Sequence, residues 1–226
     1  ALGEDGPTHQ PVEQLVTLRS TPNLDNWRPA DLVETAIAWK NAILSDNPTS
    51  LILSRQNTSF ISRTHEQVGN INKGGYRLDE EENIDMTIIA SGSELKLALD
   101  VSDSLNLAEK KCSVVSMPCL DKFLRQSVDY QNRVINFKKP ILVIELSHPN
   151  SWYKILKPTD KVVGIETFGE SAPSSVLIDH FGFTVESILK EVEVNIENDD
   201  EMDIVSDDEK EEEEKNKSQA EKDFDK

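Results

Sequence analysis

The start of the chain places a carboxylate, Asp5, four residues ahead of an imidazole, His9, in a segment rich in glycine and proline. Gly3, Gly6 and Pro7 favour a tight turn. Loops held by a folded scaffold often carry binding groups, which makes Asp5 and His9 candidates for recognition of a ligand. An Asp in a turn more often caps local backbone, and a His ahead of a helix more often lies on the surface. Spacing alone therefore favours the structural interpretation over the binding one.

Arg55 is a third candidate, because it follows a short apolar segment, residues 50–54, that is typical of a buried strand. Ligands of open parallel sheets gather at the carboxyl ends of the strands. An arginine in that position is more often part of a surface ion pair. His65, His148 and His180 have no cysteine or carboxylate at metal-ligand spacing, and we assign them no role. The sequence has no P-loop, Gly-x-Ser-x-Gly or zinc pattern, so hydrolase, nucleoside triphosphatase and metal-dependent functions are unsupported.

These candidates sit on a first unit, residues 1–62, in which strands and helices alternate. The pattern predicts a helix after Pro11, a strand over 23–27, a helix between Asp31 and Asp46, and a strand over 50–54. Strand, helix and strand in this order indicate a parallel α/β sheet. Residues 63–83 are polar and contain three glycines, and we interpret them as a linker in which Tyr76 and Leu78 could add a short strand.

A second α/β unit is predicted over residues 84–196. Four apolar segments are typical of strands, and they alternate with amphipathic segments typical of helices. The predicted strands are 86–90, 112–117, 141–144 and 161–165, and the helices are 91–101, 119–135, 151–157, 173–180 and 184–194. Thr184 is a suitable N-cap for the last helix. The expected fold class is α/β, with a doubly wound, mostly parallel sheet in this second unit.

Charge is concentrated at the end of the chain. The 226 residues carry a formal net charge of −18, and residues 197–226 contain 15 acidic and 5 basic side chains. We expect this tail to be disordered, because it has too little apolar surface to offset the entropy lost on ordering. Ser206 precedes three acidic residues, a context that acidophilic kinases prefer, although a solubilising tail is the simpler interpretation. The overall sign argues against nucleic-acid binding.

Neither a membrane span nor a signal peptide is visible, so the expected location is the cytoplasm. Cys112 and Cys119 are the only cysteines and are flanked by apolar residues. We expect both to be reduced, buried thiols.

Several segments together resemble transketolases of the bacterial and yeast type, in matching order and spacing. The segments are Gly3–Pro11, Trp27–Asp31, Leu53–Asn57, Gly74–Tyr76, Ala90–Glu94, Val115–Pro118 and Thr167–Pro173. The resemblance covers residues 1 to about 194 and only the last third of that family's pattern. It implies that residues 1–62 are the C-terminal part of a pyrimidine-binding domain and that residues 84–196 are a transketolase C-terminal domain.

The resemblance implies transfer of a two-carbon ketol unit between phosphosugars, with thiamine diphosphate and Mg²⁺ or Ca²⁺ as cofactors and a homodimer as the assembly. Asp5 would contact a sugar hydroxyl, His9 the hydroxyl end of the donor ketose, and Arg55 the sugar phosphate. The chemistry of these side chains is consistent with the roles, because carboxylates accept hydrogen bonds from hydroxyls and a guanidinium can bind two phosphate oxygens at once.

The family pattern also contains groups that this sequence does not show. The Gly-Asp-Gly segment and the following Asn that hold metal and diphosphate are not found, and the glutamate that activates the cofactor would precede Ala1. We therefore assign no catalytic, cofactor or metal ligand to this chain and expect it to be inactive alone. The alternatives are a non-catalytic association module with an acidic tail, or one chain of a split transketolase. A pyruvate dehydrogenase β subunit fits Phe168–Pro173 less well. Retention of Asp5, His9 and Arg55 together favours the enzyme.

Overall fold

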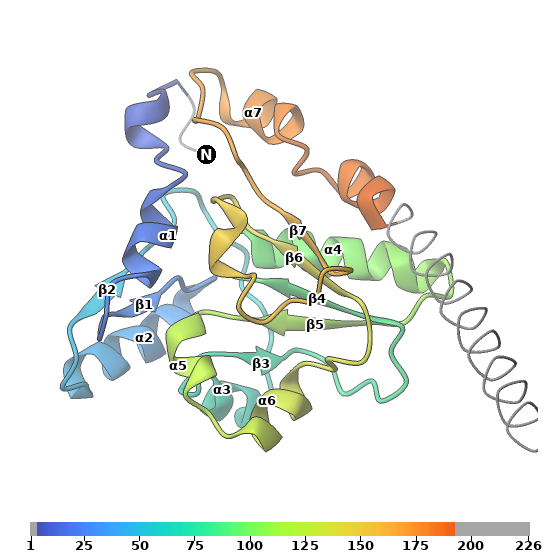
Figure 1. Cartoon of the computed structure of the whole chain (residues 1–226). Coiled ribbons are helices and arrows are strands. Elements are labelled where there is room, and N and C mark those ends of the chain that lie inside the picture. Colours follow the sequence, from blue (N-terminus) through green and yellow to red (C-terminus); the bar gives the residue numbers. More distant parts are fainter. Residues whose placement is uncertain (1–3, 193–226) are drawn as a thin grey trace, which may run out of the picture. The chain divides into compact units, whose positions relative to one another are not determined.

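The computed structural model describes residues 4–192, and the chain divides into two compact units, residues 1–189 and 190–226. The account below concerns the first unit. It begins with the 3-10 helix η1 (Pro7–His9) and the short helix α1 (Gln14–Arg19), as Figure 1 shows. Strand β1 (Asp25–Trp27), helix α2 (Leu32–Leu44) and strand β2 (Thr49–Leu51) follow.

Strands β1 and β2 pair in parallel through the crossover helix α2, which confirms the strand–helix–strand prediction. Asp31 caps α2, because its Oδ1 accepts a hydrogen bond from Glu34 N at 3.0 Å. Both strands are shorter than predicted. Arg28 N donates to Pro118 O instead of to a strand, and Pro29 has no N–H, so β1 stops at Trp27. The last backbone bond between the two segments runs from Ile52 N to Trp27 O at 2.8 Å, and the pairing ends there.

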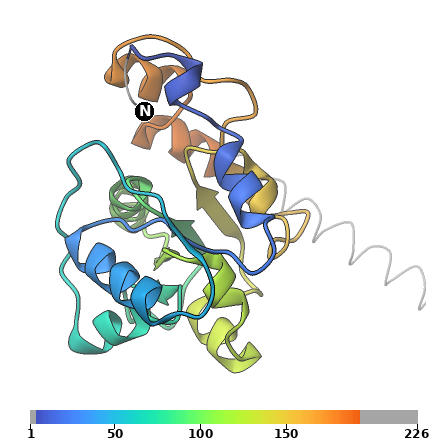
Figure 2. The same ribbon diagram turned by 90° about the vertical axis from the view of Figure 1, so that its left-hand side faces the viewer.

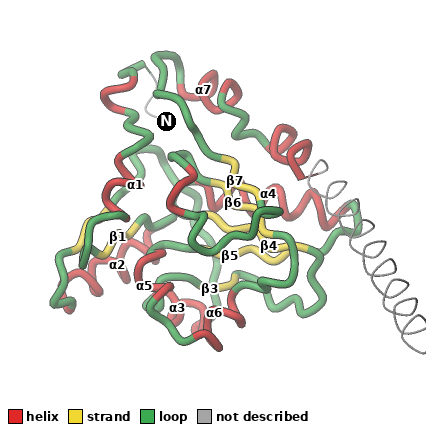
Figure 3. The backbone as a smooth tube through the Cα atoms, viewed as in Figure 1, coloured by secondary structure: helices red, strands yellow, loops and turns green. Residues whose placement is uncertain are grey.

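The larger sheet has the strand order β3-β5-β4-β6-β7, with β3 antiparallel and every other pair parallel. Its central strands are fully buried, and their apolar side chains form the core. Figure 3 shows these strands with helices on either side. The bounds are β3 Tyr76–Arg77, β4 Met86–Ala90, α4 Glu94–Leu107, β5 Cys112–Ser116, α5 Leu120–Leu124, α6 Val128–Val134, β6 Ile141–Ile144, β7 Lys161–Val163 and α7 Ser174–His180. The predicted mostly parallel α/β class is confirmed.

Residues 63–83 contain more regular structure than a polar linker. Helix α3 (His65–Ile71) begins with a capping box between Thr64 and Gln67, and β3 adds the short strand at Tyr76 that the sequence allowed. Ile71 and Tyr76 are buried, so this segment contributes to the core.

The helix predicted over residues 151–157 is wrong. The chain instead forms the 3-10 helix η2 (Pro149–Ser151) and a series of turns, because the N–H groups of Trp152 and Ile155 donate to carbonyls three residues earlier. The N-cap prediction at Thr184 is confirmed, since its Oγ1 accepts a hydrogen bond from Ser187 N at 3.2 Å.

Four features named above lie outside the described residues: the predicted end of the last helix, the acidic tail over 197–226, Ser206 and Gly3. Across residues 4–192, no helix is both long and apolar enough to pass through a membrane.

Candidate functional site

The first candidate residues lie on the opening turn, which we define as residues 4–10. Glu4 and Asp5 form a turn, Gly6 has a φ of 76°, and η1 closes with a hydrogen bond of 3.1 Å from His9 N to Gly6 O. A positive φ costs glycine little, which explains Gly6 at this point. Except for Gly6 and Gln10, the side chains and backbone of this turn are exposed. The turn therefore presents its polar groups to solvent.

Arg55 and Asp5 meet in the structure although 50 residues separate them. Arg55 Nη1 donates to Asp5 Oδ2 at 2.9 Å, and the two side chains are 67% and 44% exposed. Arg55 lies four residues beyond Leu51, the last residue of β2, because the strand ends earlier than the predicted residue 54. An ion pair this exposed adds little stability, so both groups stay accessible to a polar ligand.

His9 lies at the other end of the opening turn. Its Nδ1 is 3.0 Å from Thr8 Oγ1, and His9 lines a small cavity of about 110 Å³ together with Leu146, Ile165 and Phe181. The structure thus joins Asp5 to Arg55 directly, whereas the side-chain hydrogen bond of His9 is with Thr8, its neighbour in sequence.

The opening turn rests on the loop that leads from β7 into α7. Ser171 Oγ donates to Glu4 O at 2.5 Å, and Gln10 Nε2 donates to Glu170 O at 3.1 Å. Gly169 is packed so closely that a Cβ there would lie 2.9 Å from Gln10 Cβ. Figure 2 shows η1 beside this loop. Spacing along the chain does not indicate these contacts, because they join segments about 160 residues apart.

A buried cluster around Glu145 anchors the elements beneath the turn. Its carboxylate accepts two hydrogen bonds from Arg19 on α1, one from Ser91 Oγ and one from Trp152 Nε1. Arg28 follows β1, and its Nη1 lies 3.7 Å from Glu145 Oε1. Burial alone would raise the pKa of Glu145, but Arg19 and Arg28 outweigh it and lower the pKa to about 2. Glu145 therefore stays ionised and cannot supply a proton near neutral pH.

A second buried cluster surrounds Glu34 on α2. Its Oε1 accepts hydrogen bonds of 2.7 Å from Tyr76 Oη and 2.5 Å from Ser116 Oγ. Arg63 Nη1 donates a hydrogen bond of 2.5 Å to Asp31 Oδ2, and Arg63 Nη2 lies 3.3 Å from Glu34 Oε1. Burial and the negative charge of Glu34 raise the pKa of Tyr76, so the phenol remains protonated. This cluster joins α2 to β3 and β5, and its polar side chains bond to one another.

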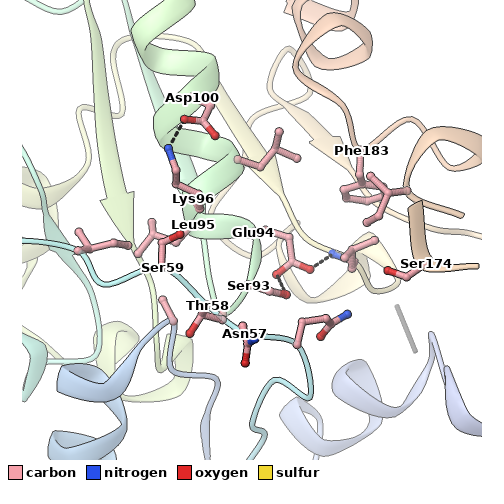
Figure 4. Close-up of a pocket in the computed structure, with 17 residues that line it drawn as sticks. Asn57, Thr58, Ser59, Ser93, Glu94, Leu95, Lys96, Asp100, Ser174 and Phe183 are labelled. Carbon is pink, nitrogen blue, oxygen red and sulfur yellow. Dashed lines mark hydrogen bonds and ion pairs between the residues drawn. The ribbon is translucent and has the colours of Figure 1, made fainter. Parts of the chain in front are cut away.

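A larger cavity of about 350 Å³ opens next to Arg55, between residues 56–61, the first turn of α4 and α7 (Figure 4). Its polar lining includes Asn57, Thr58 and Ser59. Its charged groups are already paired, because Lys96 binds Asp100 and Glu94 binds Arg28. Within the described residues it therefore offers hydroxyl and amide groups to a ligand and no unpaired cation.

The remaining candidates have local roles. His148 Nδ1 accepts a hydrogen bond from Asn150 N at 3.3 Å, and His180 lies 3.5 Å from Glu170. Cys112 and Cys119 are free and buried, as predicted, and burial raises the pKa of both thiols to about 12. In the part of the chain that is described, no three His, Cys, Asp or Glu side chains gather in a group that could hold a metal ion.

Two family models match this chain. Residues 1–60 match the pyrimidine-binding domain of transketolase, and residues 74–184 match the transketolase-like C-terminal domain. The transketolase of Buchnera aphidicola (subsp. Schizaphis graminum) is 48% identical over 196 residues, which is 85% of this chain and 30% of that protein.

Solved transketolases have the same fold. The enzyme from Campylobacter jejuni matches with a TM-score of 0.78 at 40% identity, covering 84% of this chain and 29% of that one. An H261F mutant of Pichia stipitis transketolase matches with a TM-score of 0.80 at 37% identity, covering 86% of this chain and 28% of that one. The sequence thus spans about 30% of the length of the curated relatives it matches. The chain belongs to the transketolase family.

Proposed function

We propose that this chain provides the sugar-phosphate-binding surface of a ketol transferase, with Asp5, His9 and Arg55 as the substrate-binding residues. The observation that carries the proposal is the contact between Arg55, in the loop after β2, and Asp5 on the opening turn. It brings a cation suited to phosphate next to a carboxylate suited to a sugar hydroxyl. A ketose phosphate, the donor substrate of a transketolase, carries both a phosphate and sugar hydroxyls.

Each group keeps unused bonding capacity for a substrate. Asp5 accepts from Arg55 through Oδ2, and its Oδ1 has no partner among the described residues. Arg55 uses one of its five N–H groups on Asp5, so its other donors can bind phosphate oxygens. His9 would hold the hydroxyl end of the donor ketose. Binding energy gained at the distant phosphate would position the reacting carbons without taking part in the chemistry.

The cofactor of the family would supply the carbanion chemistry of ketol transfer. The described residues do not fit it, because they offer no cluster of metal ligands for its diphosphate. We therefore propose that residues other than these bind thiamine diphosphate and its metal, Mg²⁺ or Ca²⁺. On this proposal the chain alone does not catalyse the reaction.

The domain division is part of the same proposal. It comprises a partial pyrimidine-binding domain over 1–62, a connection over 63–83, a C-terminal domain over 84–196 and an acidic tail over 197–226. The homodimer, the pentose phosphate pathway and the cytoplasmic location are further parts, and family membership alone supports them.

A chimera tests the function. Residues 1–194 would replace the matching third of the Campylobacter jejuni transketolase, whose solved structure guides the junction. The expected result is ketol transfer from xylulose 5-phosphate that falls at least tenfold when Asp5 or Arg55 is changed to alanine. An inactive chimera that still folds and binds thiamine diphosphate would overturn the proposal and favour an association module. Calorimetry on the isolated 226 residues should show no thiamine diphosphate binding.

A further inference from the structure

The opening turn cannot hold its shape by its own contacts. Residues 4, 5 and 7–9 are exposed, and η1 buries none of its residues. A three-residue 3-10 helix has little intrinsic stability in water. The exposed ion pair between Asp5 and Arg55 adds at most a small amount. Something else must fix Asp5 and His9 if they are to bind a sugar in one geometry.

The loop ahead of α7 provides that support. We call residues 169–171 the supporting loop. Ser171 Oγ donates to Glu4 O at 2.5 Å, directly before Asp5 in the chain. Gln10 Nε2 donates to Glu170 O at 3.1 Å, directly after His9. The two bonds therefore hold the opening turn at both ends, one beside each proposed substrate-binding residue.

Gly169 sets how closely the two segments approach. It is buried, and a Cβ added there would lie 2.9 Å from Gln10 Cβ and 3.0 Å from Gln10 O. The Cβ and O atoms of Gln10 are fixed to the backbone and cannot rotate away. A side chain at position 169 would therefore displace Gln10 and with it His9. The C-terminal end of the loop is held in turn by α7, whose Leu177 is buried.

From this geometry we infer that Ser171 and Gly169 are positioning residues for substrate recognition. Ser171 acts through Glu4 on Asp5, and Gly169 acts through Gln10 on His9. Neither touches the substrate. The predicted C-terminal domain thereby shapes the substrate-binding surface of the preceding segment. This inference rests on the proposed function for its consequence in catalysis, but its structural content is independent of that function.

The first test uses the 226-residue chain and needs no activity. Hydrogen exchange reports on the amides of His9 and Gln10, which bond to Gly6 O at 3.1 Å and to Pro7 O at 3.3 Å. Ser171→Ala should speed their exchange about fivefold, the effect of losing one ordinary hydrogen bond. Ser171→Thr, which keeps the hydroxyl, should restore the slow rate. Ser175→Ala is the matched control, because Ser175 is exposed and forms no side-chain hydrogen bond within residues 4–192. Unchanged exchange in Ser171→Ala would overturn the inference.

The second test uses the chimera and two ketol donors. Ser171→Ala should lower kcat/KM about fivefold for xylulose 5-phosphate. It should leave hydroxypyruvate unaffected, because that donor has no sugar hydroxyl for Asp5 to recognise. Gly169→Ala should lower kcat/KM for both donors, because His9 would move. An equal loss for both donors in Ser171→Ala would contradict the role through Asp5. A chimera that folds and binds thiamine diphosphate but shows no ketol transfer would refute the proposed function, while the exchange result would still decide whether the loop supports the turn.

Discussion

Arg19 and Glu145 are 126 residues apart in the sequence, yet Arg19 donates hydrogen bonds of 2.7 and 2.9 Å to the two carboxylate oxygens of Glu145. The pair is buried, with side chains 4% and 1% exposed. It fastens α1, the helix that follows the opening turn, to the end of β6. The carboxyl ends of parallel strands are where ligands usually bind. Here a structural ion cluster occupies the end of β6, and the candidate binding groups lie instead on the opening turn and in the loop after β2.

Replacing Glu145 should strongly destabilise the fold. Glu145→Gln keeps the shape but leaves Arg19 as a buried cation without its carboxylate, whereas Arg28 keeps its ion pair with Glu94. Removing one member of a buried pair typically costs about 3–5 kcal/mol. Urea denaturation followed by tryptophan fluorescence should show a lower midpoint, because Trp152 donates to Glu145 at 2.6 Å. Asp100→Asn is the control, since its exposed pair with Lys96 should contribute less than about 1 kcal/mol. Equal losses in the two variants would contradict the account.

The same carboxylate should make stability depend on pH in the acid range. The pKa of Glu145 falls from the ordinary value of 4.5 to about 2 on folding. A group with a depressed folded pKa contributes stability that is present above its unfolded pKa and is lost as pH falls through its folded pKa. The free energy of unfolding should therefore decline between about pH 5 and pH 2, by about 3 kcal/mol from this group.

The variant Glu145→Gln separates this group from the other carboxylates. Its urea midpoint should depend less on pH over the same range, so that the difference between the two proteins narrows as pH falls. A constant difference between pH 6 and pH 3 would show that Glu145 does not titrate in this window.

Arg55 should matter for phosphorylated donors only. In the chimera, Arg55→Ala should raise KM for xylulose 5-phosphate about 10–100-fold, the range expected for losing charged hydrogen bonds. Arg55→Lys should have an intermediate effect, because lysine cannot bind phosphate bidentately. Turnover of hydroxypyruvate, which has no phosphate, should be unaffected. The control is Lys40→Ala, an exposed cation of α2 with no ion pair in the described part of the chain. A similar KM for phosphorylated donor in wild type and Arg55→Ala would rule out the assigned role.

Local patterns predicted the α/β class and most elements of this fold. Apolar segments such as Met86–Ala90 and Ile141–Ile144 form strands as expected, because residues buried on both faces of a parallel sheet leave a clear hydrophobic signal. The helix expected over 151–157 does not form, because the N–H groups of Trp152 and Ile155 bond to carbonyls three residues earlier. The indole of Trp152 also bonds to Glu145, seven residues back, and the apolar pattern of the segment does not indicate that contact.

The candidate site was predictable only in its parts. Asp5, His9 and Arg55 stood out through residue type and resemblance, whereas the contact between Asp5 and Arg55 depends on tertiary folding. Ser171 and Gly169 could not have been selected from spacing, because their partners Glu4 and Gln10 lie about 160 residues away. Long-range hydrogen bonds of this kind leave no periodic signal.

Two glycines in neighbouring segments should respond to alanine in opposite ways. Gly74 has a φ of 90°, and a Cβ there would lie 2.3 Å from Cys119 O and 2.7 Å from Phe123 N. Gly74→Ala should therefore destabilise the fold by more than about 3 kcal/mol, through both backbone strain and overlap with the backbone. Gly69 lies within α3, where a Cβ would meet nothing within 4 Å. Gly69→Ala should stabilise the protein by about 1 kcal/mol, because alanine favours a helix more than glycine does. Thermal unfolding of both variants checks the prediction. If Gly74→Ala were as stable as the wild type, residues 63–83 would not pack against α5 as described, and their role in joining α2 to the larger sheet would have to be reconsidered.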